Sequence, residues 1–336
     1  MILIASERFG AHVTPPGHPE RIERAEVFDR IAAEWTARGG RTLAPTLASR
    51  EALLRVHTEA LVASIEATAG RASMIDPDTF TSPDTAQVAQ LAAGAAIDAV
   101  DSALQTGEPA FALVRPPGHH AERDRAMGFC FYNNVAVAAA HALANGLARV
   151  AIVDIDVHHG NGTQWITYED PRVLYVSSHQ FPYYPGTGAA GEVGEGAGTG
   201  FTVNIPLAAG ATDADYQLVY GAIVRPVLEQ FAPELVIVSA GFDAHERDPL
   251  ASMRVTTAGY ASLMNGLRLW TAGSALAVVT EGGYDLTALG ECVEASLDVL
   301  SAPQSAAWPV VGQPAPRGEQ ALAAVRAAQA TYWRGI

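Results

Sequence analysis

The segment RVAIVDIDVHH, residues 149–159, decides how the rest of the chain is interpreted. Residues 149–155 form a short run rich in Val and Ile, which predicts a buried β-strand. Two acids and two histidines stand at the end of this run: Asp154, Asp156, His158 and His159. Burying such groups without partners would be costly, so the segment predicts a core strand that carries a functional site at its end.

Similar apolar runs alternate with helical patterns along the chain. The other predicted strands are 2–5, 110–114, 172–177, 201–205, 234–240 and 275–281. The predicted helices are 18–37, 49–69, 83–106, 133–146, 213–230, 256–271 and 285–300. This alternation predicts an α/β fold, with one parallel sheet flanked by helices on both faces.

Composition narrows the class of protein. The 336 residues carry a formal net charge of −15, which argues against nucleic acid as a partner and suits cationic substrates. Cys130 and Cys292 are too few for a disulfide framework, so we expect a reducing, cytoplasmic location. The start MILIASERFG predicts a strand rather than a leader, and no apolar run approaches about eighteen residues, so we expect no membrane partner.

Two segments fall outside the alternation. The glycine-rich residues 186–200 lead into a strand rather than a helix, so we interpret them as a surface loop and not a phosphate loop. Residues 301–336 comprise a Pro/Ala linker and a tail helix at about 317–331. The tail packs on the domain or on a neighbouring subunit, and the sequence leaves a homo-oligomer open.

Polar clusters follow four of the predicted strands. They are RPPGHH (115–120), the acids and histidines of 154–159, GFDAHERDP (241–249) and EGGYD (281–285). Functional groups gather beyond the carboxyl ends of strands in such sheets, so we expect one site. A catalytic zinc needs about three protein ligands. An extended chain would point Asp156 and His158 the same way, and Asp243 could supply the third ligand.

Five motifs together carry a family resemblance. They are RPPGHHAERDRAMGFCFYNN (115–134), DIDVHHGNGT (154–163), YPGTG (184–188), SAGFDAHERDP (239–249) and EGGYD (281–285). In order and spacing the chain resembles the zinc-dependent histone deacetylase family across roughly residues 1–300. It is most similar to the class II and bacterial deacetylase-like, acetylpolyamine amidohydrolase branch. The resemblance implies the arginase–deacetylase fold, with residues 1–300 as the catalytic domain.

The resemblance also implies roles for particular positions. One catalytic zinc would be bound by Asp156, His158 and Asp243. Catalysis would use His119, His120, Tyr284, Asp154 and Asn161. The substrate tunnel would be lined by Gly128, Phe129, Tyr184 and Leu250. A structural potassium would be held by groups of Asp154, Asp156, His158, Ser177 and Ser178. A second potassium site, mostly backbone, would lie around Thr167, Asp170, Val173 and Phe201.

The implied activity is removal of acetyl or related acyl groups from lysine side chains. His120 would act as general base, and His119 beside Asp154 would stay charged. Tyr284 would donate to the substrate carbonyl oxygen, and the Gly128 carbonyl would accept the amide N–H. Asn161 stands where one branch has aspartate, and a neutral partner raises the pKa of His120 less. We interpret His159 as a core histidine rather than a ligand.

The substrate stays open between two classes. Leu250 stands where polyamine-selective members carry a glutamate, which favours an acyl-lysine protein or peptide over an acetylated polyamine. Tyr184 replaces a common phenylalanine and makes the tunnel wall more polar. Arg24 either lies near an internal channel beyond the metal or is an exposed helix arginine.

Other readings compete with a zinc deacetylase. A two-manganese ureohydrolase shares the fold, but Asp243 is followed by Ala244 and His245 rather than by a second acid. An inactive binding protein of the same fold is less well supported, because every expected catalytic position is filled. The Asp-His-Asp ligand set leaves Fe(II) or Co(II) open in place of zinc.

Overall fold

Eight parallel strands form the central sheet of the computed structural model, which describes residues 1–302, 308 and 314–336. Their order across the sheet is β2-β1-β5-β10-β9-β6-β7-β8. The strands are β1 (Ile2–Ile4), β2 (Arg41–Leu43), β5 (Ala110–Ala112), β6 (Val150–Asp154), β7 (Val173–Gln180), β8 (Thr202–Leu207), β9 (Leu235–Ala240) and β10 (Ala275–Thr280). The predicted parallel-sheet α/β domain is confirmed. The three-residue β2, at one edge, has too short an apolar run to be predicted.

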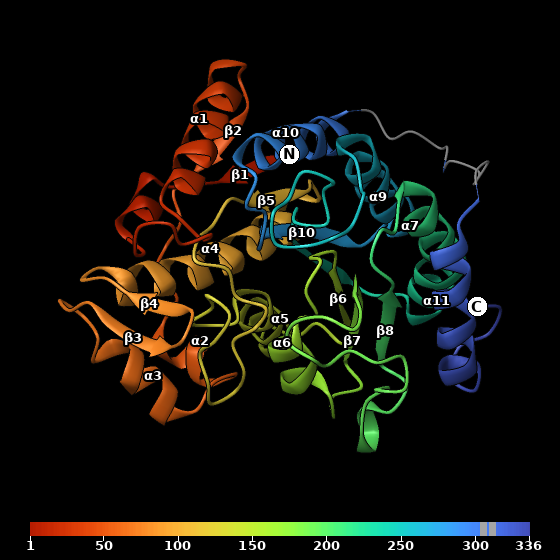
Figure 1. Cartoon of the computed structure of the whole chain (residues 1–336). Coiled ribbons are helices and arrows are strands. Elements are labelled where there is room, and N and C mark those ends of the chain that lie inside the picture. The colour runs from red at the N-terminus through yellow and green to blue at the C-terminus, as the bar shows by residue number, and fades with distance from the viewer. Residues whose placement is uncertain (303–307, 309–313) are drawn as a thin grey trace.

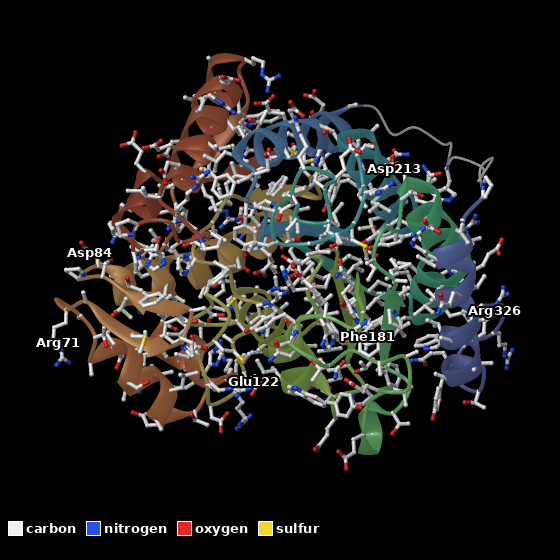
Figure 2. The ribbon with its side chains drawn as sticks, in the orientation of Figure 1. Arg71, Asp84, Glu122, Phe181, Asp213 and Arg326 are labelled. Carbon is white, nitrogen blue, oxygen red and sulfur yellow. The ribbon has the colours of Figure 1, made fainter. Side chains whose placement is uncertain are left out.

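Helices cover both faces of the sheet (Figure 1). On one face lie α4 (Thr85–Thr106) and α5 (Asn134–Ala144), which share a core with Val150 and Ile152 of β6. The alternate residues Ala151 and Val153 join the opposite core. The helices on that side include α1 (Glu23–Ala37), α7 (Asp213–Val219), α8 (Arg225–Phe231), α9 (Thr257–Trp270) and α10 (Leu286–Ser301). Side chains fill the space between the layers (Figure 2), which explains why the strand residues are apolar at successive positions.

The prediction of one continuous helix over residues 49–69 is wrong. The segment forms α2 (Arg50–Leu54) and α3 (Glu59–Glu66), because Thr58 accepts the N–H of Leu61 and starts a new helix. A hairpin and a short helix were also not predicted. The hairpin of β3 (Ser73–Asp76) and β4 (Thr79–Thr81) lies outside the main sheet, and α6 (Asn161–Thr167) is a short helix directly after the DIDVHHG segment.

The tail helix α11 (Pro316–Gln329) packs against α7 and β8 (Figure 1). The side-chain amide of Gln329 donates to the carbonyl of Thr202 at 2.6 Å, and the indole of Trp333 donates to the carbonyl of Gly200 at 2.8 Å. Most of the predicted linker, residues 303–307 and 309–313, lies outside the described residues. The domain boundary at residue 300 and a homo-oligomer therefore stay predictions. In the described part of the chain, every helix is too short or too polar to cross a bilayer.

Candidate active site

The polar clusters meet at the carboxyl ends of four neighbouring strands. Strands β5, β10, β9 and β6 lie side by side in the middle of the sheet, and the loops that follow them converge beyond the carboxyl ends of these strands. Each of Asp156, His158 and Asp243 offers one ligand atom, and these three atoms lie within 4.8 Å of one another. The predicted ligand set is therefore brought together from the loops after β6 and β9.

Asp156 and His158 meet for a reason other than the one predicted. Strand β6 ends at Asp154, so the alternation of an extended strand does not direct them, and that expectation is wrong. Instead the chain makes two successive turns closed by aspartate side chains. Asp154 Oδ1 accepts the N–H of Asp156 at 3.1 Å, and Asp156 Oδ1 accepts the N–H of His158 at 2.8 Å. The local sequence itself folds the ligand pair into place.

The donor set fits zinc. The Nδ1 atom of His158 lies 3.2 Å from Oδ1 of Asp156 and 3.1 Å from Oδ2 of Asp243. Bonds of 2.0–2.1 Å to a tetrahedral zinc place neighbouring ligand atoms roughly 3.3 Å apart. The second oxygen of each carboxylate is held by the backbone, since Val157 N–H donates to Asp243 at 2.9 Å and Gly282 N–H donates to Asp156 at 2.9 Å.

The surroundings of the ligands leave little room and carry much negative charge. A Cβ at Gly282 would lie 2.2 Å from Oδ2 of Asp243, so only glycine fits there. Four carboxylates here are fully buried: Asp154, Asp156, Asp243 and Glu281. Burying several acids together is unfavourable unless a cation neutralises them. The charge balance and the donor geometry thus point independently to a bound cation.

His119 lies against Asp154 and is fully buried. Its Nδ1 is 3.1 Å from Oδ2 of Asp154, which also accepts the hydroxyl of Tyr175 at 3.1 Å. Burial lowers the pKa of His119, but the charges of Asp156 and Asp154 outweigh it and raise the pKa to about 10. A cation on Asp156 would cancel part of this effect, and Asp154 would remain as the partner of the imidazolium.

His120 has the opposite electrostatic environment. Its Nδ1 lies 2.8 Å from Oδ1 of Asn161, whose Nδ2 donates to Glu122 at 2.7 Å. This arrangement makes Oδ1 the acceptor and fixes the imidazole with its proton on Nδ1. Burial first, and then the charges of His119 and His158, hold the pKa of His120 well below its usual range. His120 is therefore a neutral imidazole whose Nε2 can accept a proton.

A pocket of about 190 Å³ opens onto these groups. It is lined by Asp78, His120, Gly128, Phe129, His158, Tyr183, Tyr184, Leu250 and Tyr284. All four predicted tunnel residues are among them. Gly128 has a φ of +57°, and a Cβ there would lie 2.6 Å from the ring of His120. The following Phe129 also has a positive φ, 69°, and its N–H donates to Thr79 Oγ1 at 3.0 Å.

The match to a family model decides the wider identity. Residues 18–300 match the family described as the histone deacetylase domain. The chain belongs to the histone deacetylase family. A crystal structure of the HDA15 HD domain superimposes with a TM-score of 0.91 at 38% identity, covering 99% of this chain and 97% of the other. The arginase–deacetylase fold, expected from the motifs, is thereby confirmed.

Curated relatives include two deacetylases from distant organisms. A protein of Archaeoglobus fulgidus named "Probable deacetylase" is 42% identical over 291 residues, covering 84% of this chain and 81% of the relative. Histone deacetylase 15 of Arabidopsis thaliana is 40% identical over 330 residues, covering 95% of this chain. That match spans 59% of the plant protein's own length.

The potassium positions of this deacetylase-family chain are only partly arranged by side chains. Asp154 and Ser177 are paired neighbours on β6 and β7. The hydroxyl of Ser177 is hydrogen-bonded to His179 at 2.9 Å, and that of Ser178 to Tyr220 at 2.9 Å. At the second position, the carbonyls of Thr167, Asp170 and Phe201 already accept backbone N–H groups. Both potassium sites stay predictions.

Several site residues were missed by the sequence interpretation. Glu281 accepts the N–H groups of Gly118 and His119 at 2.6 and 3.1 Å, and burial raises its pKa to about 7. Tyr183 stacks on His158 at 5.8 Å between ring centres. Glu281 stands in the quoted EGGYD motif, so its position was visible, but its backbone partners were not.

The structure shows the surroundings of His159 and Arg24, two residues that the sequence interpretation did not assign to catalysis or to the metal. His159 is bonded to Thr187 at 2.7 Å and to Gln164 at 3.0 Å, in accordance with its interpretation as a core histidine. Arg24 is fully buried, so the alternative of an exposed helix arginine is wrong. Periodicity placed Arg24 on a helix but could not show that the loop of Tyr284 covers it.

Proposed function

We propose that this chain is a zinc-dependent deacetylase that removes acetyl or related acyl groups from lysine side chains. The observation that carries the proposal is one pocket lined by His158 of the ligand group together with His120 and Tyr284. The residues that would hold zinc are Asp156, His158 and Asp243. When bound, such a zinc lowers the pKa of its water toward about 7 and polarises an amide carbonyl.

The two tandem histidines would divide the proton chemistry. His120 enters the reaction neutral, accepts the proton of the attacking water on Nε2, and returns it to the leaving amine. Its Nδ1 keeps its own proton and donates it to Oδ1 of Asn161, which keeps the ring oriented throughout. His119 remains paired with Asp154 and contributes positive charge beside the reacting atoms. The different partners of the two rings support this assignment, since Asp154 favours the charged form of His119 and neutral Asn161 favours the charged form of His120 less.

Tyr284 and Gly128 would act on the amide itself. Burial raises the pKa of Tyr284 well above its usual value, so the phenol keeps its proton and can donate to the developing oxyanion. The Gly128 carbonyl accepts the thiol of Cys130 at 3.3 Å and has a second lone pair for the substrate N–H. The narrow pocket suits an unbranched alkyl chain carrying one acyl group.

An acetylated polyamine is the second candidate substrate. Asp78 lines the same pocket, and its charge could attract a second ammonium group. Leu250, the other pocket residue that bears on the choice between lysine and polyamine substrates, carries no charge. We favour the acyl-lysine substrate, because its alkyl chain needs only apolar contacts beyond the amide.

The test is a panel of substrates with the purified, metal-analysed protein. Acetyl-lysine peptides, longer acyl-lysine peptides and N-acetylated polyamines are compared at matched concentration, with and without chelator. We expect chelator-sensitive turnover that is restored by zinc and is highest for an acyl-lysine peptide. Turnover confined to polyamines selects the second candidate. A lack of turnover with zinc, Fe(II) and Co(II) on every substrate would refute the hydrolase role.

A further inference from the structure

Asp248 connects the loop that follows β9 with the loop that carries Tyr284. Its Oδ2 atom accepts the backbone N–H groups of Tyr284 at 2.7 Å and of Asp285 at 3.3 Å. Its Oδ1 atom accepts the N–H of Leu250 at 2.9 Å. Only 7% of the residue is exposed. One buried carboxylate thus binds three backbone groups from two loops that both reach the pocket.

The backbone before Tyr284 needs such support. Gly282 and Gly283 precede it, and Gly283 has a φ of +124°, which residues with a side chain rarely adopt. Two consecutive glycines leave this part of the chain more conformations than other residues would. The direction of the Tyr284 side chain therefore depends on the groups that bind its backbone from outside.

Arg24 holds the same loop from the other side. Its Nε donates to the carbonyl of Gly283 at 2.8 Å, and its Nη2 donates to the carbonyl of Glu281. The guanidinium also lies 5.2 Å from the centre of the Tyr284 ring. Arg24 thus donates to the carbonyls of Glu281 and Gly283 before Tyr284, and Asp248 accepts the N–H groups of Tyr284 and Asp285.

The burial of Asp248 has a cost that its partners must offset. Burial and the nearby charge of Asp243 raise the pKa of Asp248 to about 7. Asp248 is absent from the pocket lining and from the metal-ligating group found in the described chain. Its hydrogen bonds to the site therefore run through its three N–H partners.

We propose that Asp248 is a positioning residue that fixes the backbone of Tyr284 and so directs the phenol into the pocket. The inference rests on the proposed function, in which Tyr284 donates to the oxyanion. An asparagine at residue 248 keeps the shape but has one acceptor oxygen for three N–H groups, so at least one partner loses its bond. A small displacement of a catalytic group can cost a large factor in rate.

The test is a double-mutant cycle between Asp248→Asn and Tyr284→Phe, measured on an acetyl-lysine peptide with the zinc-loaded protein. We expect Asp248→Asn alone to lower kcat by about tenfold, with KM changed by less than about twofold. In the Tyr284→Phe background it should lower kcat by less than about twofold, because the hydroxyl it positions is gone. An equal tenfold loss in both backgrounds would overturn the proposal, as would a loss expressed only in KM.

Asp215→Asn is the matched control. Asp215 is also a buried aspartate that accepts backbone N–H groups, from Thr212 at 2.8 Å and from Gly318 at 2.8 Å, but it serves the docking of α11. We expect it to lower the melting temperature and to leave kcat within about twofold of wild type. If it lowers kcat as much as Asp248→Asn, the effect of Asp248 is one of general stability and the proposal fails.

A crystal structure of the Asp248→Asn variant provides a readout that does not need turnover. We expect Tyr284 displaced or in more than one rotamer, while Asp156, His158 and Asp243 keep their positions. An undisturbed Tyr284 would overturn the positioning role. Failure of the proposed function looks different, because the wild-type protein itself would then lack turnover on every acyl substrate.

Discussion

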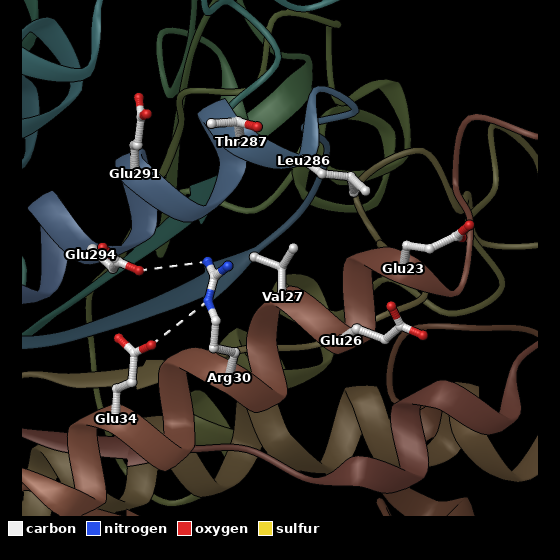
Figure 3. A pocket seen from close by; sticks show the side chains of 9 residues that line it. All are labelled: Glu23, Glu26, Val27, Arg30, Glu34, Leu286, Thr287, Glu291 and Glu294. Atoms are coloured by element: carbon white, nitrogen blue, oxygen red, sulfur yellow. Dashed lines mark ion pairs between the residues drawn. The ribbon is translucent and has the colours of Figure 1, made fainter.

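Two cavities of this protein differ in the carboxylates that lie in them or next to them. The groove between α1 and α10 (Figure 3) has a volume of about 630 Å³, against about 190 Å³ for the pocket of His120 and Tyr284. Its charged lining consists of Glu23, Glu26, Arg30, Glu34, Glu291 and Glu294. Arg30 lies 3.9 Å from Glu34 and 3.7 Å from Glu294, and all three side chains are well exposed.

The difference lies in burial and in backbone contacts rather than in size or in the number of acids. Water solvates the glutamates of the groove, so their charges need no cation and their ion pairs contribute little. Asp156 and Asp243 lie behind the pocket against His158 and have lost that water, and backbone N–H groups hold one oxygen of each in place. The comparison teaches that buried, oriented carboxylates mark the functional cavity, although the groove is larger.

Removing a buried carboxylate should have the largest effect. We expect Asp243→Asn to lose most bound zinc and to lower kcat/KM by more than the 10–100-fold typical of residues that only support a ligand. Elemental analysis and peptide turnover provide the measurement. Full zinc content with wild-type activity would show that the acids at the pocket behave like those of the groove.

Tyr284→Phe tests a pocket group that does not bind the metal. The hydroxyl is expected to contribute in the transition state, so kcat should fall by roughly 10²–10³-fold while zinc content stays at the wild-type value. Steady-state kinetics and metal analysis are measured on the same preparation. A wild-type rate would remove the oxyanion role assigned to this residue.

Asn161→Asp should shift the pH dependence. His120 works unprotonated, and its pKa lies well below its usual value because of burial and the neighbouring charge of His119. A carboxylate beside Nδ1 favours the imidazolium and raises that pKa, so the acidic limb of kcat/KM should move up by about one pH unit. Asn145→Asp, on an exposed helix end, is the control. An unchanged limb would exclude His120 as the titrating base.

Leu250→Glu should change specificity more than rate. A glutamate at this half-exposed pocket position can pair with a second ammonium, and an exposed ion pair contributes up to about 1 kcal/mol. The ratio of kcat/KM for an acetylated polyamine to that for an acetyl-lysine peptide should therefore rise about fivefold. Leu250→Gln controls for size, and an equal rise in that variant would exclude a charge effect.

Charge removal in the groove should have the smallest effect. We expect Glu23→Gln combined with Glu26→Gln to leave zinc content unchanged and kcat/KM within about twofold of wild type, because these water-accessible acids line the groove and not the site. The same peptide assay applies. A loss like that of Asp243→Asn would abolish the distinction between the two cavities.

The sequence predicted the sheet and the candidate catalytic and metal-binding side chains better than the contacts that orient those side chains. Seven of the strands were visible because buried parallel strands are continuous apolar runs, and the candidate ligands stood directly after two of them. The sequence did not show that Glu281 and Asp248 hold the backbone of the site. Their partners are backbone N–H groups, which do not distinguish one residue type from another. The helix break at Thr58 was missed because a capping residue can separate two helices while the spacing of apolar residues continues across it.

Helix α11 closes the outer side of β8, the last strand of the sheet. An uncovered strand offers a row of free backbone groups to any other chain, which makes it a template for aggregation. Shortening the protein before Pro316 would bare this strand and would remove Leu322 and Val325, which now pack in the core. The consequence would be poor solubility rather than altered catalysis, so expression fragments that stop near residue 300 are a poor choice.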